Sequence, residues 1–174
     1  MRAVHVMCKR GFTEARFAAQ SSDFRSSMLI VAIACALLVA LTTVTHYEAL
    51  SNLNTGLTSL AIPNRNKLLV VISTAFIAHA LEMALYGFTI YVLVRYLGAG
   101  HLSGPAGLSL ASCLYFSAET YTSLGFGDLT PVGSIRMIAG VEALNGLLLI
   151  GWSASYAYIA MERFWNADAS RRRD

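Results

Sequence analysis

Three long apolar stretches dominate the pattern of hydrophobic and polar positions. Residues 28–45 hold no charged side chain, residues 68–94 hold only His79 and Glu82, and residues 137–161 hold only Glu142. Each is long enough to cross the roughly 30 Å hydrocarbon core of a bilayer as a helix. A fourth apolar stretch, residues 106–118, is too short to cross and suits a helix that enters the membrane and returns. The pattern predicts an all-α integral membrane protein with three transmembrane helices and one re-entrant helix.

The composition agrees with a membrane location. The chain of 174 residues is 56% hydrophobic and 13% charged, with a mean hydropathy of +0.55, which is too apolar for an ordinary soluble domain. A net charge of +3 does not indicate a nucleic-acid partner, and the arginine run at 171–173 suits a tail held at an anionic membrane face. The scattered cysteines (Cys8, Cys35 and Cys113) form neither a disulfide framework nor a zinc motif.

The segment before the last apolar stretch carries the most specific motif. It reads Thr-Ser-Leu-Gly-Phe-Gly-Asp-Leu-Thr-Pro over residues 122–131. Residues 123–127 resemble the TVGYG selectivity filter of the potassium-channel pore family. The order of short helix, glycine motif, acid, proline and helix resembles that family's pore segment over residues 104–165.

The resemblance implies a K⁺ site made mainly of backbone oxygens. Carbonyl groups of Ser123, Leu124, Gly125, Phe126 and Gly127 would replace the hydration shell of the ion, and the Ser123 hydroxyl would complete the innermost site. The glycines would adopt φ angles that other residues tolerate poorly. The chain has one filter copy and no internal repeat, so the resemblance implies a homotetramer in a lipid bilayer, the plasma membrane or bacterial inner membrane. No cofactor beyond the permeant K⁺ is implied.

Residues around the filter are expected to support it. In part of the family, a glutamate at the position of Glu119 bonds to the filter's acid, here Asp128. Two close carboxyl groups in a poorly solvated pocket cannot easily both ionise, so one would hold a proton, unless Glu119 is solvated separately in a vestibule. Tyr115 and Phe116 stand where many members have two tryptophans that wedge the filter, and Thr122 directly precedes it.

The last helix has the features of the family's inner helix. Gly146 falls where the family has a hinge glycine, and it either permits bending or allows close helix packing. The residues expected to line the inner cavity share one face of the helix: Leu147, Ile150, Ala154 and Tyr158.

Two pairs of polar residues interrupt the predicted helices. His79 and Glu82 are three residues apart, and Glu142 and Asn145 repeat this spacing, so each pair shares a helix face. The simpler interpretation is that they are buried polar pairs holding helices in register. The alternative is a carboxylate–histidine metal site or a proton pathway.

The predicted organisation has four parts. Residues 1–27 form an N-terminal tail, 28–67 an extra helix and cytoplasmic loop, 68–165 the pore module, and 166–174 a basic C-terminal tail. The family resemblance implies that the acid end of the filter faces outside. The N-terminus then also lies outside, and most basic residues beyond position 27 lie inside, as the positive-inside rule expects. The basic residues of 1–27 conflict with this orientation, and three explanations compete. The segment is translocated regardless of its charge, the native start is Met28, or the first apolar stretch does not fully cross the membrane.

Potassium-selective passive conduction is the leading functional hypothesis. A weakly selective monovalent cation channel is the alternative, because Ser123, Leu124 and Phe126 depart from the strict filter and Phe126 lacks the hydroxyl of the family's tyrosine. A membrane enzyme is disfavoured because no nucleophile–base motif is present, and a non-conducting scaffold is a further class. No helix has arginine at every third position, so a voltage sensor of the usual design is not expected.

Overall fold

A computed structural model describes residues 2–59, 62–105 and 107–171, with side chains described over 25–57, 62–64, 66–105 and 107–166. The elements in chain order are α1 (Arg2–Ser59), α2 (Asn64–Leu97), β1 (Gly100–Ser103), α3 (Leu110–Tyr121), β2 (Thr130–Gly133) and α4 (Ile135–Arg171). The side chains of 1–24 and 167–174 lie outside the described residues, so the two predicted tails stay predictions, as does the role of the arginine run at 171–173.

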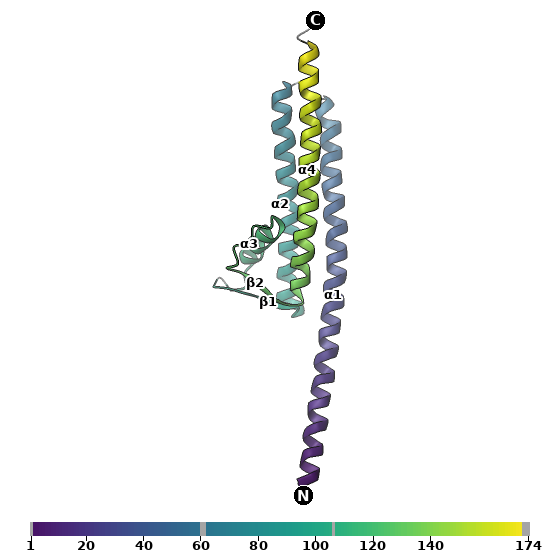
Figure 1. Ribbon diagram of the computed structural model, residues 1–174, viewed down its shortest axis with the longest axis vertical. Helices are drawn as coiled ribbons and strands as arrows, with labels where there is room; N and C mark the ends of the chain where they lie inside the picture. The colour runs from purple at the N-terminus through teal and green to yellow at the C-terminus, as the bar shows by residue number, and fades with distance from the viewer. Residues whose placement is uncertain (1, 60–61, 106, 172–174) are drawn as a thin grey trace.

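The three long helices run side by side, with α2 antiparallel to α1 and α4 (Figure 1). Their membrane-length apolar segments are Arg25–Leu57, Asn66–Leu97 and Ile135–Asn166, which confirms the prediction of an all-α membrane protein with three spans. The first helix continues well past residue 45, where the uncharged stretch ends. The polar residues beyond this point fit into the helix, because Tyr47 and Glu48 are exposed at its surface. His46 is buried, and its ring nitrogens have hydrogen-bonding partners on other helices.

The short helix α3 packs against α2 and α4 and does not cross the bundle (Figure 1). It starts later than the apolar stretch suggested, at Leu110, because Ser109 caps it by accepting a hydrogen bond from the backbone N–H of Ser112 at 3.0 Å. It also ends later, at Tyr121, because its polar last turn finds buried partners.

A two-stranded antiparallel sheet, which the sequence pattern did not predict, closes the segment that contains α3. β1 pairs with β2 in the register Gly100↔Gly133 to Ser103↔Thr130. The strands join the end of α2 to the start of α4 and thereby fix both ends of the loop that carries α3 and the filter motif (Figure 1).

The main apolar core lies where α1, α2 and α4 meet α3 and the strands. Its largest fully buried members are Tyr86, Ile90, Tyr121, Ile135 and Ile138. Two glycines allow α3 to approach the long helices closely. A Cβ on Gly87 would lie 2.9 Å from Leu114 Cα, and one on Gly146 would lie 2.2 Å from the Tyr121 carbonyl oxygen. The core thus holds α3 and the filter motif against α2 and α4.

Candidate functional site

The filter motif forms a loop directly after α3, and its backbone alternates in handedness. Ser123, Gly125 and Gly127 have φ values of 57°, 57° and 80°, whereas Leu124 and Phe126 between them do not have positive φ. Such alternation turns successive N–H groups towards one side of the chain, and the carbonyl groups towards the other. The loop therefore has one donor side and one acceptor side.

The donor side of the loop faces α3. Ser123 N–H donates to the Thr120 carbonyl at 3.0 Å, and Leu124 N–H donates to the Glu119 carbonyl at 2.8 Å. Further along, Phe126 N–H donates to Oε1 of the Glu119 side chain at 3.1 Å. Among the described residues, no hydrogen bond reaches a carbonyl oxygen of residues 123–127, and residues 122–128 are exposed. The acceptor side is therefore open to a ligand.

Glu119 is a buried brace for the loop. Only 4% of its surface is exposed, and its carboxylate supports the Phe126 amide directly. Asp128 accepts instead from the Tyr115 hydroxyl at 3.4 Å, and no direct Glu119–Asp128 hydrogen bond is found in the described part of the chain. Tyr115 thus links α3 to the acid at the loop's end, while Phe116 is buried in the core. The proposed sharing of a proton between the two acids stays a prediction.

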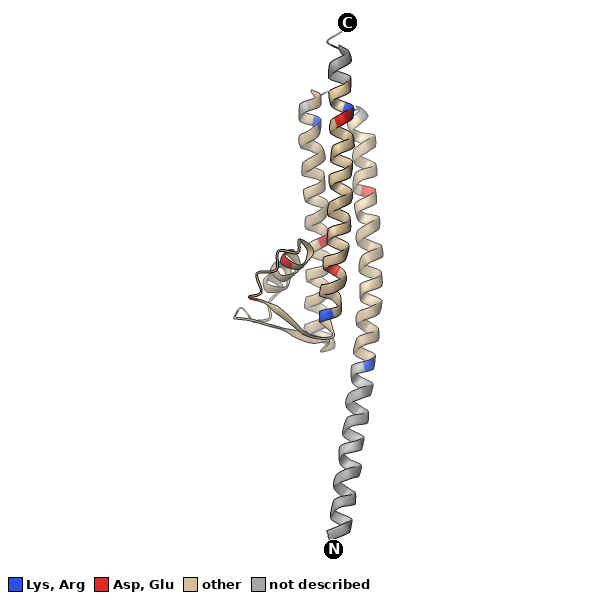
Figure 2. Cartoon of the chain, viewed as in Figure 1, with Lys and Arg blue, Asp and Glu red and all other residues tan. Residues whose placement is uncertain are grey.

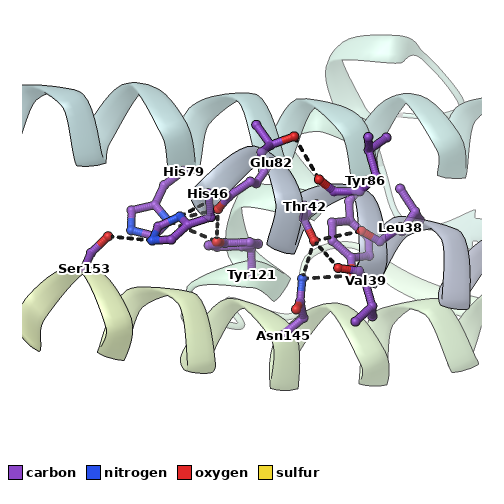
Figure 3. A network of polar contacts seen from close by, with 12 residues as sticks. Leu38, Val39, Thr42, His46, His79, Glu82, Tyr86, Tyr121, Asn145 and Ser153 are labelled. Atoms are coloured by element: carbon purple, nitrogen blue, oxygen red, sulfur yellow. Dashed lines mark hydrogen bonds and ion pairs between the residues drawn. The ribbon is translucent and has the colours of Figure 1, made fainter. Parts of the chain in front are cut away.

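Thr122 and Tyr121 fix the start of the loop. Thr122 is the C-cap of α3, and its hydroxyl donates to the Ala118 carbonyl at 2.7 Å. The fully buried Tyr121 hydroxyl donates to Glu82 Oε2, and His79 Nδ1 lies 3.0 Å from the same hydroxyl (Figure 3). A hydrogen-bond network on the long helices therefore holds the residue two positions before Ser123.

His46, which the sequence pattern did not single out, completes this network. Its Nδ1 lies 2.9 Å from Glu82 Oε1, and its Nε2 lies 3.1 Å from Ser153 Oγ on α4 (Figure 3). The predicted pair of His79 and Glu82 is also present, at 3.1 Å. The only sequence signal for His46 was a single imidazole beyond the uncharged stretch, and nothing in its spacing indicated a partner 36 residues away.

The second predicted pair does not form within its own helix. Glu142 accepts from the Ser117 hydroxyl on α3, which also contacts the Met83 carbonyl oxygen at 2.7 Å. Asn145 donates to Thr42 Oγ1 at 2.8 Å and to the Tyr86 hydroxyl at 3.2 Å. Both residues join helices, which agrees with the interpretation as buried polar groups that hold the helices in register. Figure 2 shows acidic residues part-way along the helices and the described basic residues near the ends of the bundle.

The residues expected to line a cavity are exposed on α4. Leu147, Ile150 and Tyr158 have exposed fractions of 56%, 36% and 62%, and Ala154 is also exposed. Gly146 is instead buried against Tyr121, so the structure gives it a packing role, and bending at this position stays a prediction.

Comparison with known proteins identifies the family. A family model described as "Ion channel" matches residues 68–163, more than half of the chain. The protein belongs to the ion-channel family. The match covers most of α2, all of α3, the filter loop and most of α4, so the loop between the two long helices lies inside the matched region. Membership makes the protein a transport protein and not an enzyme.

Two relatives are similar to part of the channel. Two-pore potassium channel 1 of Arabidopsis thaliana is 37% identical over 76 residues, which cover 43% of this chain and 21% of the relative. Protein LctB of Geobacillus stearothermophilus is 36% identical over 73 residues, which cover 37% of this chain and 54% of the relative. The chain thus matches about a fifth and about half of the length of these relatives. No solved structure matches the channel significantly.

Proposed function

We propose that the channel conducts K⁺ selectively and passively across the plasma membrane, the inner membrane in a bacterium, as a homotetramer. The observation that carries the proposal is the alternating backbone of residues 123–127. The N–H groups of Ser123, Leu124 and Phe126 are hydrogen-bonded to α3, and no donor among the described residues reaches a carbonyl oxygen of the loop. Consecutive carbonyl oxygens on one side of a strand can replace the waters around a K⁺ ion. The ion-binding residues are therefore Ser123 to Gly127, with Ser123 also offering its hydroxyl.

The need for more than one copy follows from the same loop, and the number four follows from the resemblance to the potassium-channel pore family. A single loop provides oxygens on one side of an ion only, and carbonyl groups at membrane depth must be buried in protein or line a water-filled path. The exposed face of α4 that holds Leu147, Ile150, Ala154 and Tyr158 would surround a shared cavity below the filter. In this arrangement Glu119, Asp128, Thr122, Tyr115 and Phe116 support the filter from behind.

Selectivity for K⁺ is supported by the motif and by one relative, whose name states a potassium channel. A weakly selective cation channel is the second candidate, and Phe126 favours it. This residue has no hydroxyl to hydrogen-bond to a neighbouring helix, and its side chain is 69% exposed in the single chain. A looser filter would discriminate less between K⁺ and Na⁺.

The test combines mass and flux. The full chain, purified in mild detergent, should have the native mass of a tetramer, and in liposomes it should carry a K⁺ current whose reversal potential follows the K⁺ gradient. A reversal potential near zero with K⁺ on one side and Na⁺ on the other would favour the weakly selective channel. Only monomers or dimers, together with no flux, would contradict the proposal.

A further inference from the structure

Side chains from all four helices converge behind α3 in a cluster that the conduction mechanism does not require. The cluster consists of His46 on α1, His79 and Glu82 on α2, Tyr121 on α3 and Ser153 on α4 (Figure 3). The Nδ1 atoms of the two histidines lie 2.9 Å and 3.1 Å from the two oxygens of the Glu82 carboxylate. The donor atoms of three ligand-type side chains therefore point at one small volume.

The cluster is buried and needs a positive charge. Glu82 and His46 have no exposed side-chain surface, and His79 has 16%. A buried carboxylate is costly unless a cation compensates it. In the described part of the chain, the ion-pair partners of Glu82 are these two imidazoles and no lysine or arginine. The cost is avoided by a protonated imidazole, by a proton on the carboxyl group itself or by a bound cation.

The ligand set suits a borderline metal ion. Potential ligand atoms of His46, His79 and Glu82 all lie within 4.8 Å of one another. Zinc binds histidine nitrogen and carboxylate oxygen at about 2.0–2.2 Å, so tetrahedral ligand atoms lie about 3.3–3.5 Å apart. The N–O distances of 2.9 Å and 3.1 Å, each to a different oxygen of the Glu82 carboxylate, need to widen by a few tenths of an ångström, and any pair of ligand atoms near the 4.8 Å limit needs to close. We propose that His46, His79 and Glu82 bind one Zn²⁺-class divalent transition-metal ion per chain.

The residues around these ligands are those that a metal site requires. A metal-bound histidine usually has its second ring nitrogen hydrogen-bonded to a neighbouring group, which fixes the ring. Ser153 Oγ occupies this position at 3.1 Å from His46 Nε2. When the metal takes Nδ1, the imidazole proton resides on Nε2 and is donated to Ser153, so the ring stays neutral as coordination demands. The Tyr121 hydroxyl oxygen, 3.0 Å from His79 Nδ1, lies close enough to become the fourth ligand once its proton no longer bonds to Glu82.

A bound ion would join α1 and α2 to the end of α3. Because Tyr121 lies two residues before Ser123, occupancy would change how stably the filter conducts and leave the filter's own oxygens in place. This consequence for conduction rests on the proposed function, whereas the binding of the metal does not.

Binding is tested on the full chain purified in detergent and freed of metal by a chelator. Zn²⁺ is titrated calorimetrically, and Co²⁺ serves as a coloured probe of the site. We expect one ion per chain and the visible absorption of four- or five-coordinate Co²⁺, without the near-ultraviolet band that thiolate ligands from Cys35 or Cys113 would add. His46→Gln and His79→Gln should each weaken binding by at least about tenfold. His101→Gln is the matched control, because His101 is exposed in β1 and distant in sequence from the cluster.

The outcomes separate this site from the pore. Failure of the wild-type protein to bind either metal overturns the proposal, even if a variant cannot be purified. Equal loss of affinity in His101→Gln and His79→Gln also overturns it. If the conduction of the metal-free wild-type protein changes with pH and does not change when Zn²⁺ is added, the cluster binds protons, and the proposed metal site is overturned. Metal binding without K⁺ flux would leave the site standing and contradict the proposed conduction.

Discussion

Single residues in the filter loop act mainly through their backbone. The positive φ values at Ser123, Gly125 and Gly127 set the direction of the carbonyl groups. Leu124 and Phe126 are 58% and 69% exposed, so their side chains do not belong to the core of the single chain. Ser123 is the only non-glycine residue with positive φ among the described residues. A residue held in this region costs free energy and persists where the surroundings enforce it, often at functional sites. Here the enforcing contacts are the hydrogen bonds from the loop amides to α3.

Gly125→Ala should abolish K⁺ flux and leave the assembly intact. A Cβ at Gly125 meets no atom within 4 Å, but φ of +57° strains any L-residue, so the backbone must turn and take its carbonyl groups with it. Gly98→Ala is the matched control, because Gly98 has φ of +60° and equally open space but lies at the end of α2. Flux in liposomes and native mass measure the two effects. Normal flux in Gly125→Ala, or equal loss in Gly98→Ala, would contradict the filter assignment.

Glu119→Gln and Glu119→Ala should behave differently. The glutamine oxygen can still accept the Phe126 N–H, so K⁺ over Na⁺ preference should change little, although the stability of the conducting state should fall if a proton is shared with Asp128. Alanine leaves the Phe126 amide without its acceptor, which costs about 1–3 kcal/mol if the amide stays buried. Open probability and reversal potential in single-channel recordings distinguish the two. Identical open probabilities for both variants and wild type would show that Glu119 is not a brace.

At the scale of elements, the close approach of α3 to the long helices decides the position of the filter. Gly87 and Gly146 leave no room for a side chain, because Leu114 Cα and the Tyr121 carbonyl oxygen occupy the space. Buried polar contacts add direction to this packing, through Ser117 to Met83 and Tyr121 to Glu82. α3 is thus fixed along its length against α2 and α4, and the carbonyl groups of the filter loop accept no hydrogen bond from the described residues.

Gly146→Ala should destabilise the channel, whereas Gly151→Ala should not. The new methyl group would lie 2.2 Å from the Tyr121 carbonyl oxygen, and over-packing of this kind typically costs about 1–3 kcal/mol. At Gly151 nothing lies within 4 Å, and alanine favours a helix. Thermal unfolding in detergent measures the difference. Equal stability of the two variants would remove the packing role and favour a hinge at Gly146.

Hydropathy predicted the spans and the re-entrant helix, and the resemblance of residues 123–127 to a known filter identified the motif, because each depends on local composition or on a short sequence. Hydropathy did not predict the sheet, since Gly100, Gly133 and Pro131 are residues typical of loops and only their pairing makes them strands. It also missed His46 and Ser117 as partners of Glu82 and Glu142, because helix spacing relates residues of one helix and gives no register between helices. Contacts across helices depend on how the bundle packs, which no single segment encodes.

At the scale of the whole molecule, the exposed apolar surface shows that one chain is not the complete assembly or is covered by lipid. Along α4 the exposed positions include Leu144, Leu147 and Leu148, and α1 and α2 carry others. α1 packs against both α2 and α4, so α1 and α2 occupy part of the surface of α4. In the proposed tetramer, the remaining face of α4 surrounds the pore.

Tyr158→Cys should become accessible to a charged thiol reagent applied from the cytoplasmic side, and modification should reduce K⁺ flux. Tyr158 is 62% exposed near the end of α4 that we place inside, whereas Ala160, two residues on, is 7% exposed. Ala160→Cys is therefore the control and should react slowly. Both are made in a Cys8→Ser background, since Cys35 and Cys113 are buried. Modification of Tyr158→Cys without loss of flux would place this face towards lipid and not towards the pore.

The contacts of the two fully buried glutamates have a consequence for how the chain enters the membrane during synthesis. A carboxylate at the centre of a bilayer opposes insertion by about 2.5–3.5 kcal/mol on scales measured with the translocon. Glu82 follows His46 and His79 in the chain, and Glu142 follows Ser117, so each acid has a partner that the ribosome has already made. When the helix that carries each glutamate inserts, a residue that hydrogen-bonds to the carboxyl group has therefore already been synthesised. Neither acid has to enter the lipid without a hydrogen-bonding partner.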